Sequence, residues 1–474
     1  MKRFKEKYYI IVSIITFVIL FIVLLGFYPG LVSYDGNNQW QQVQSQVFTN
    51  AHPFFSTYFM YILSKIWNNV TIVILYQILL YSIAWGYFCK TIKANNKKQI
   101  IVTCIFTIFI TLIPLTCLYS ITLWKDIIYT SYLFISAIML YEWENNNNKF
   151  GWLKYCFFGI ILFMIYSYRH NGVIVALMLL VLFYIICFVN YRRRNISKIS
   201  LKKCIMVFIT FFSLIILFSI PKKTILNNSK EKIDKQTSQS SNYSTIDGYM
   251  VWMMGAHLKD NNIKDSKDKD FLNKIIPLDS WKKAYNPYLI NNTNLVENFD
   301  KKYLSLNRNR FKELFIKYSI RNPLSIVEHY LKSDALLINP VSSINGYVYV
   351  YCFPEMADLP EYTKIRPIIK PIRWFYLRLS DFSLKKPFII FYQPAFILYI
   401  SLFITFILSK RIFGRKIWLL SLPMILNTLS LLPINLAQDL RYVYINYLTF
   451  YGLLLISILN YKSILKNNTN LSIK

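Results

Sequence analysis

The stretch "YYIIVSIITFVILFIVLLGFY" (residues 8–28) contains no charged side chain. A bilayer core about 30 Å thick is crossed by about 20 apolar residues in a helix. The stretch therefore predicts a membrane-spanning helix. It is longer than the apolar region of a signal peptide, and no A-x-A cleavage site follows it, so we expect the helix to be retained.

Nine more apolar runs of similar length follow the first one. They cover residues 70–89, 100–118, 121–141, 151–167, 173–190, 204–220, 388–409, 417–433 and 442–460. The 474-residue chain is 55% hydrophobic and only 16% charged, whereas soluble proteins have about 25% charged residues. We predict an all-α polytopic membrane protein with about ten transmembrane helices. The shorter apolar segment 53–67 predicts a re-entrant or interfacial helix.

The basic residues predict the orientation of these helices. The formal net charge is +31, but Lys and Arg stand in short clusters between the apolar runs. These clusters are "MKRFKEK" at the start, "KTIKANNKK" from Lys90, "YRRRNISKISLKK" from Tyr191, "SKRIFGRK" from Ser409 and "YKSILK" from Tyr461. If the helices alternate in direction, all the clusters fall on one face. By the positive-inside rule that face is cytoplasmic, with both termini inside a plasma membrane, and the charge does not indicate nucleic-acid binding.

Three regions follow from this layout. Residues 1–220 form an N-terminal transmembrane module with outer loops, residues 221–387 form an extracytoplasmic segment, and residues 388–474 form the C-terminal helices. The extracytoplasmic segment mixes charges, as in "KDNNIKDSKDKD" from Lys259, and is long enough for a small folded domain. Cys352 lies alone in it, and the seven cysteines show no zinc or disulfide spacing.

A basic and aromatic stretch, "RPIIKPIRWFYLR", ends this segment. Its residues Arg366, Lys370 and Arg373 predict contact with anionic lipid along the outer membrane surface. A solvated basic connector is the alternative.

Charged residues also gather at the predicted outer ends of the helices. An ionisable group in or beside a bilayer costs a few kcal/mol unless it is paired or hydrated. The residues are Asp35, Lys125 and Asp126 in "LWKD", Arg169 in "YRHNG", and Asp439 and Arg441 in "QDLRY". Each alone is explained by a helix cap, an interfacial anchor, a polar turn or a local ion pair. Together they predict one functional layer, with Tyr34, His52, Trp124, His170, Asn171, Asp439 and Tyr442 as supporting residues.

This set of carboxylates and cations suits the transfer of a sugar from a lipid phosphate. The departing phosphate is a weak base, so Lys and Arg stabilise it and no general acid is needed. The incoming hydroxyl still has to lose a proton, which a carboxylate within hydrogen-bond reach accepts as general base.

The order "YPG…SYDG", "HPFFSTYFMYILSKI", "LWKD", "YRHNG" and "QDLRY" resembles the GT-C superfamily of polyprenyl-phosphate-sugar glycosyltransferases, in an uncharacterised bacterial branch. The resemblance covers about the first 175 residues and the last 40. It implies a membrane enzyme that moves a sugar from a polyprenyl-phosphate carrier to a cell-envelope glycan or glycopolymer on the outer face.

The resemblance also implies roles for particular residues. Asp35 matches the base of the first outer loop, Asp126 the second acidic position, and Arg441 the basic residue near the lipid phosphate. Lys125 and Arg169 are added as phosphate ligands from their charge and depth alone. Many relatives carry "DE" in the first loop, whereas Gly36 follows Asp35 here. No cofactor is therefore assigned, and a divalent cation stays an open alternative.

Two other functions remain open. A flippase for lipid-linked sugars would use the same outer charges, but it would also need charges at mid-depth or on the inner side of its path. A polymerase or ligase that transfers whole glycans would also use outer arginines and a large outer segment. Neither the sugar nor the stereochemistry follows from the sequence.

Overall fold

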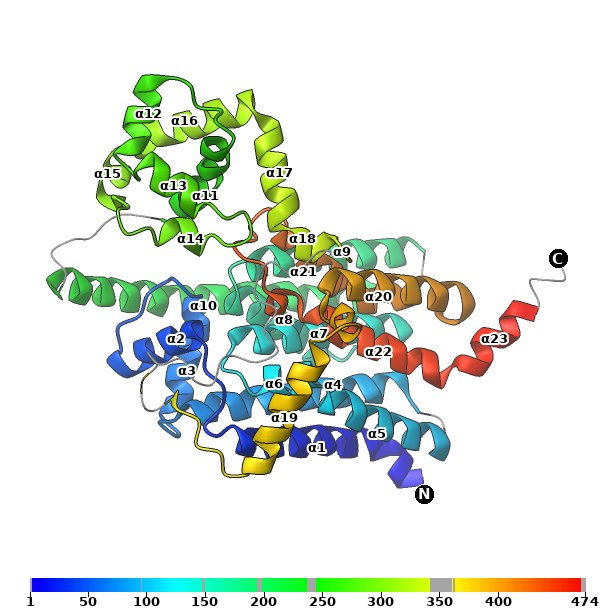
Figure 1. The fold of residues 1–474 in the computed structure, drawn as a ribbon. Coiled ribbons are helices and arrows are strands. Elements are labelled where there is room, and N and C mark those ends of the chain that lie inside the picture. Colours follow the sequence, from blue (N-terminus) through cyan, green and yellow to red (C-terminus); the bar gives the residue numbers. More distant parts are fainter. Residues whose placement is uncertain are drawn as a thin grey trace. The chain divides into compact units, whose positions relative to one another are not determined.

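The computed structural model describes residues 2–94, 96–146, 150–193, 198–236, 244–341, 360 and 363–469, and these are helical with no β-strand among them (Figure 1). Cys352 lies outside the described residues. The N-terminal half contains α1 (Lys2–Gly26), α2 (Tyr34–Ser45), α3 (Phe54–Ser64), α4 (Val70–Ile92), α5 (Lys97–Leu112), α6 (Pro114–Ser120), α7 (Lys125–Asn145), α8 (Trp152–Tyr168), α9 (Gly172–Arg192) and α10 (Lys198–Gln236). The rest contains α11 (Thr245–Lys259), α12 (Ser266–Asn273), α13 (Leu278–Ala284), α14 (Asn291–Asn294), α15 (Lys301–Leu306), α16 (Arg308–Arg321), α17 (Pro323–Ser333), α18 (Ala335–Ile338), α19 (Lys370–Ser383), α20 (Pro394–Leu408), α21 (Trp418–Leu431), α22 (Ile445–Leu459) and α23 (Tyr461–Thr469), with short 3-10 or π turns at Phe388–Tyr392, Ser409–Phe413, Gly414–Ile417 and Leu440–Val443.

Long apolar helices make the fold typical of a helical membrane protein. Within the described residues, five helical stretches are long and apolar enough to cross a membrane: Lys7–Gly26, Val70–Ile92, Gly172–Arg192, Lys202–Lys232 and Pro394–Leu431. A sixth is α5 with α6, if this pair, bent by 70°, counts as one span. Each of the ten apolar runs of the sequence forms helix. The predicted short helix after Pro53 is α3, with 11 residues.

The stretch Pro394–Leu431 is a hairpin of two helices. Gly414 has a φ of +61° between them, a conformation that glycine adopts without steric cost. The hydroxyls of Thr405 and Ser421 are hydrogen-bonded at 2.7 Å, whereas a straight helix would hold these residues about 24 Å apart. The chain therefore reverses at Gly414, and α20 and α21 run in opposite directions.

The chain divides into two compact units whose boundaries differ from those predicted at residues 220 and 387. The first unit contains residues 1–232, 349–430 and 441–474, and the second contains residues 233–348 and 431–440. The end of an apolar run is not a helix stop, so α10 continues through Pro221 to Gln236. At the other boundary, α19 belongs to the first unit.

The basic and aromatic stretch from Arg366 is tied to the end of α1. The backbone N–H of Arg366 donates to Tyr28 O at 2.7 Å, and a Cβ on Gly26 would lie 2.7 Å from Ile372 of α19. Arg366 and Lys370 are exposed. Their contact with lipid stays a prediction.

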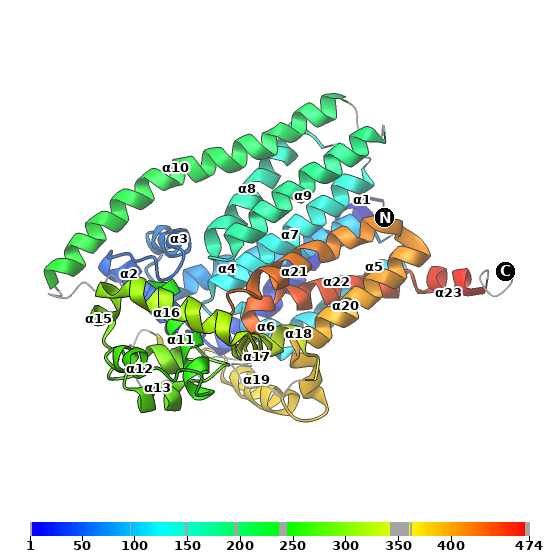
Figure 2. The same ribbon diagram turned by 90° about the horizontal axis from the view of Figure 1, so that it is seen from above.

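The long helices of the first unit run side by side (Figures 1 and 2), and basic segments of the sequence lie at one end of them. Contacts there join the start of α1 to the end of α4, the start of α5 to the end of α22, and the end of α7 to α8, α9 and the α20–α21 turn. They are Ala94 N to Tyr8 Oη (3.0 Å), Gln99 Nε2 to Leu459 O (3.2 Å), Lys154 Nζ to Glu142 Oε1 (2.6 Å), Asn190 Nδ2 to Glu144 Oε2 (2.8 Å) and Lys416 Nζ to Glu144 O (3.2 Å). Most of the basic clusters of the sequence thus meet at one end of this unit.

The second unit has its own apolar core and holds the segment that precedes Arg441. Val251, Trp281 and Phe311 are fully buried in the core. Main-chain hydrogen bonds run from Ile290 N to Leu436 O (3.0 Å) and from Gln438 N to Tyr288 O (3.2 Å). The side-chain amides of Asn435 and Gln438 donate to Ser333 O (2.8 Å) and Lys332 O (2.6 Å). Residues 435–438 are therefore anchored on both sides.

Candidate active site

The loop after α1 is aligned with the start of α7 by main-chain pairing. Gly30 has a φ of +124°, and a Cβ there would lie 2.1 Å from Ile74 Cδ1, so the turn after α1 requires glycine. Leu31 N then donates to Ile121 O at 3.0 Å, and Leu123 N donates to Leu31 O at 2.7 Å. This pairing brings the start of α2, which carries Asp35, beside the start of α7.

Gly36 permits the close approach of α2 to the segment before α7. Ser33 caps α2 by accepting from Gly36 N at 3.1 Å, and its hydroxyl also accepts from Trp124 Nε1 at 2.8 Å. A Cβ on Gly36 would lie only 2.6 Å from Leu123 O. The packing thus leaves no space for a carboxylate side chain after Asp35, which is where the sequence departs from the "DE" pattern.

Two arginines join the carboxylates of two separate helices. Arg441 Nη2 lies 2.7 Å from Asp35 Oδ2, and Arg441 Nη1 lies 4.0 Å from Asp126 Oδ2. Arg169 Nη1 lies 2.8 Å from Asp126 Oδ1. The side chain of Asp126 is 2% exposed and that of Asp35 is 38% exposed. Asp126 is therefore an enclosed counterion for both arginines, and Asp35 is the carboxylate that a substrate can reach.

Aromatic rings hold the two guanidinium groups in place. The Arg441 guanidinium lies 5.2 Å from the ring centres of Trp124 and of Tyr442, and the Arg169 guanidinium lies 4.4 Å from Tyr442. Cations at such distances from aromatic faces are attracted electrostatically. The arginines are thus fixed by charge and by stacking, which prepares them to bind a second anion without large rearrangement.

Lys125 and His52 lie on the side of Asp35. Lys125 Nζ is 3.2 Å from His52 Nδ1. Burial and the nearby Lys125 charge lower the pKa of His52 to about 4, so the imidazole is neutral at pH 7 and accepts from the ammonium. Burial alone would raise the pKa of Asp35, but the Arg441 and Lys125 charges hold it well below its usual range. The Asp35 carboxylate is ionised.

Arg169 also lines a pocket of about 170 Å³ beside the cluster. His170 and Lys222, both exposed, supply its other positive or ionisable groups. Phe55 and Phe218 supply apolar surface from α3 and α10. The pocket is therefore lined by both cationic and apolar side chains.

The structure brings most of the predicted site residues together. Asp35, His52, Trp124, Lys125, Asp126, Arg169, Arg441 and Tyr442 form the cluster described above, and Asn171 lies behind it, donating from Nδ2 to Ser430 Oγ at 3.0 Å. Tyr34 is 56% exposed at the start of α2. Asp439 is buried and belongs to the second unit. The described residues contain no group of three or more His, Cys, Asp or Glu arranged to hold a metal ion.

Several supporting residues were missed by the sequence reasoning. Tyr129 donates to Asn427 Oδ1 at 3.0 Å and lies 5.7 Å from the Arg169 guanidinium. Gln39 Nε2 donates to Ser56 Oγ and Thr57 Oγ1, both at 3.0 Å, and so ties α2 to α3. The sequence does carry a signal for Asn427, because this residue is an amide inside the apolar run "MILNTLS" and buried polar groups need partners. It carries no such signal for Tyr129.

Comparison with protein-family models, with curated proteins and with solved structures finds no match to this chain.

Proposed function

We propose that this chain is a membrane glycosyltransferase that moves a sugar from a polyprenyl-phosphate carrier to a hydroxyl of an extracytoplasmic cell-envelope acceptor. The observation that carries the proposal is the ion pair of Arg441 with Asp35 beside a buried Asp126. The cluster contains three cations, Lys125, Arg169 and Arg441, and two carboxylates. Its net positive charge suits a phosphate ligand.

In the proposed reaction the two carboxylates have different roles. Arg441 and Arg169 bind the carrier phosphate and stabilise its charge as the bond between the sugar and the phosphate breaks. Asp35 accepts the proton of the acceptor hydroxyl, whose oxygen forms the new bond to the sugar. Asp126 keeps both arginines in place and stays enclosed.

Binding of the donor would also raise the pKa of the proposed base, Asp35. While Arg441 is paired with Asp35, the carboxylate has a lowered pKa and is a weak proton acceptor. A phosphate that takes over the donors of Arg441 removes part of this positive charge, so the pKa of Asp35 rises toward the range useful for general base catalysis. The base is thus expected to be strongest only when the donor is bound.

A lipid-linked donor is supported by the surroundings of the cluster. The pocket that contains Arg169, His170 and Lys222 is walled by phenylalanines. The hydroxyl of Thr71, near the start of α4, donates to Pro29 O in the first outer loop at 2.9 Å. Lys90 lies in the last turn of the same helix. These residues are roughly 30 Å apart along α4, close to the thickness of a bilayer core.

We place the cluster at the outer membrane surface and the basic end in the cytoplasm, with ten spans, both termini inside and the second unit outside. This placement follows the positive-inside tendency.

The test is Asp35→Asn in cells, with Glu142→Gln, near the end of α7 in the first unit, as the control. We expect Asp35→Asn to reach the membrane in normal amount and to lower sugar transfer by about 10²–10⁴-fold. The measurement is the sugar composition of the envelope, together with transfer to an acceptor in isolated membranes. Full transfer by Asp35→Asn would exclude the proposed base.

The same membranes separate the alternatives. Movement of a labelled carrier across vesicles without acceptor, unchanged in Asp35→Asn, would favour a flippase. A product that gains a whole glycan rather than one sugar would favour a polymerase or ligase.

A further inference from the structure

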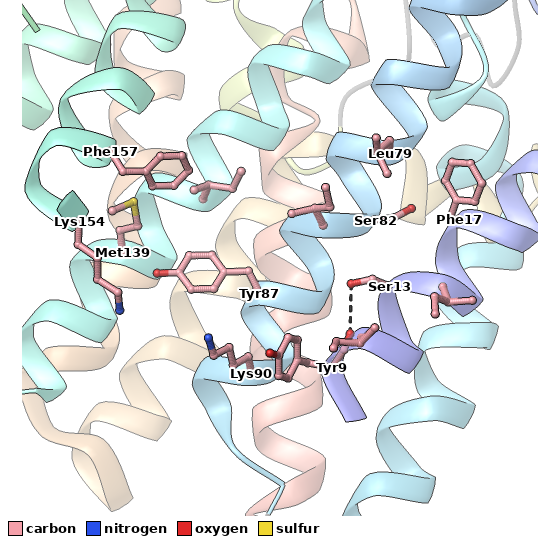
Figure 3. Close-up of a pocket in the computed structure, with 14 residues that line it drawn as sticks. Tyr9, Ser13, Phe17, Leu79, Ser82, Tyr87, Lys90, Met139, Lys154 and Phe157 are labelled. Carbon is pink, nitrogen blue, oxygen red and sulfur yellow. Dashed lines mark hydrogen bonds between the residues drawn. The ribbon is translucent and has the colours of Figure 1, made fainter. Parts of the chain in front are cut away.

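An apolar groove lies in the first unit, and none of the cluster residues lines it. It is formed by residues of α1, α4, α7 and α8 and encloses about 630 Å³, within the roughly 300–1,000 Å³ of ordinary ligand sites. Its walls include Ile14 and Phe17 of α1, Ile83 of α4, and Phe157 of α8. Figure 3 shows Lys90, Tyr9 and Lys154 toward one end of the groove, and Phe17, Leu79 and Phe157 toward the other.

The two serine hydroxyls in the groove are already hydrogen-bonded within the protein. Ser13 donates to Tyr9 O at 3.1 Å, the bond drawn in Figure 3, and Ser82 donates to Ile78 O at 2.8 Å. Both hydroxyls are therefore satisfied by their own helices. Ile14 and Ile83 on the rim are about half exposed, so the groove is open along its side. An alkyl chain fits such a surface, whereas a polar ligand would lose hydrogen bonds to water without replacement.

The basic end of the groove carries excess positive charge. Lys154 Nζ lies 2.6 Å from Glu142 Oε1, and Tyr87 donates to Glu142 Oε2 at 2.5 Å. Glu142 therefore compensates Lys154. Lys90 lies 5.2 Å from the ring of Tyr9, is exposed, and has no carboxylate within 4 Å among the described residues. Lys93 and Lys97 follow it, also exposed.

We propose that this groove is a binding site for one anionic phospholipid, with an acyl chain between α1 and α8 and the phosphate at Lys90. Charge complementarity selects this occupant, because an apolar slot that ends in an uncompensated ammonium matches a chain attached to a phosphate. Lys90 lies roughly 30 Å along α4 from Thr71, which contacts the loop that leads to Asp35, and no cluster residue lines the groove. The site is therefore separate from the proposed catalytic centre and does not depend on its chemistry.

The test measures lipid retention by native mass spectrometry. The full-length protein is purified in detergent and incubated with equal amounts of phosphatidylglycerol and phosphatidylcholine of the same chains. Two variants change the site: Lys90→Gln removes the headgroup contact, and Ile83→Trp fills the groove. Their matched controls are Lys202→Gln, an exposed lysine near the start of α10, and Ile105→Trp, an isoleucine of α5 that is 62% exposed.

We expect the wild type and both controls to retain one phosphatidylglycerol in preference to phosphatidylcholine. Lys90→Gln should weaken this retention about fivefold, the effect of about one basic side chain near an anionic lipid, and Ile83→Trp should abolish it. Equal loss in Lys90→Gln and Lys202→Gln would overturn the proposal. So would equal retention of the two lipids by the wild type, or a wild type that retains neither. Lys90 is exposed, so its variant tests the site even if Ile83→Trp fails to fold.

Discussion

The two ends of the first unit both carry charges, but the charges are arranged differently. At the end with Asp35, groups from α2, α7, the α8–α9 turn and the segment before α22 meet, and Asp126 is enclosed between two arginines. At the basic end, Lys154 pairs with Glu142 and is 45% exposed. Lys416 donates to the main-chain oxygen of Glu144 at 3.2 Å.

We interpret the exposed charges of the basic end as determinants of helix orientation in the membrane, and the enclosed charges at the Asp35 end as parts of a functional site. Exposed pairs contribute about 0–1 kcal/mol and tolerate substitution. Enclosed charges cost several kcal/mol to desolvate and persist only when they are fully paired. Stability alone poorly explains an end that retains five charged groups in or beside an enclosed cluster, and this is why we propose the chemistry there.

The largest effect is expected when the enclosed carboxylate is removed. Asp126→Ala leaves Arg169 without its nearest counterion and Arg441 with Asp35 alone, so we expect a loss of about 3–5 kcal/mol of stability. Glu142→Ala removes a pair whose lysine is 45% exposed, together with the hydrogen bond from Tyr87, and should cost less, about 1–2 kcal/mol. Thermal unfolding of both variants in the same detergent measures the difference, and equal costs would remove the distinction drawn between the two ends.

A smaller effect is expected from the glycine that lets α2 approach α7. Gly36→Ala places a Cβ 2.6 Å from Leu123 O, so α2 has to shift, at a cost of about 1–3 kcal/mol. Gly151→Ala is the control, because a Cβ there meets nothing within 4 Å. If the two variants unfold at the same temperature, the close approach at Gly36 does not constrain the position of Asp35.

Much of the fold could be predicted because membrane helices are read from composition. The apolar runs at residues 8–28 and 70–89, for example, correspond to α1 and α4. The end of α10 could not be predicted, because Lys, Thr and Asn after Pro221 neither favour nor forbid further helix. The position of α19 depends on packing against Gly26, which no local pattern reveals.

The site was predictable in its charges but not in its geometry. Asp35, Asp126 and Arg441 stand out because charges beside apolar runs are costly. Leu31 pairs with Thr122, and this pairing places Asp35 beside the start of α7. Neither residue has a chemical property that would have predicted the pairing, and so the enclosure of Asp126 and the accessibility of Asp35 could not be predicted either. Gly36, which the sequence marks as a departure from the "DE" pattern, has a packing reason that only the structure supplies.

The segment that leads into Arg441 offers a test of how firmly the cluster is held. Asn435→Ala removes the bond to Ser333 O, and leaving one carbonyl unpaired should cost about 1 kcal/mol. We expect faster amide hydrogen exchange in residues 435–440, whereas Asn292→Ala, at an exposed position of α14, should leave it unchanged. Identical exchange in the two variants would show that main-chain bonds alone anchor the segment.

The smallest effect on stability at neutral pH is expected at His52, and this effect changes with pH. Its pKa is lowered from about 6.5 to about 4 in the folded chain, so between these values the unfolded chain binds more protons than the folded one. Stability therefore falls as the pH decreases from about 6.5 to about 4, and the contribution of His52 is fully present above about 6.5.

His52→Gln removes this titration. At pH 7.5 we expect it to cost about 1 kcal/mol or less, the contribution of the lost hydrogen bond from Lys125. As the pH falls toward 4, the wild type should lose more stability than this advantage, so the two unfolding temperatures should converge and then cross, because protonated His52 repels Lys125 and Arg441 while glutamine stays neutral. A constant difference across this range would mean that His52 does not change its charge beside Lys125, and the neutral imidazole would then not be what positions the ammonium next to Asp35.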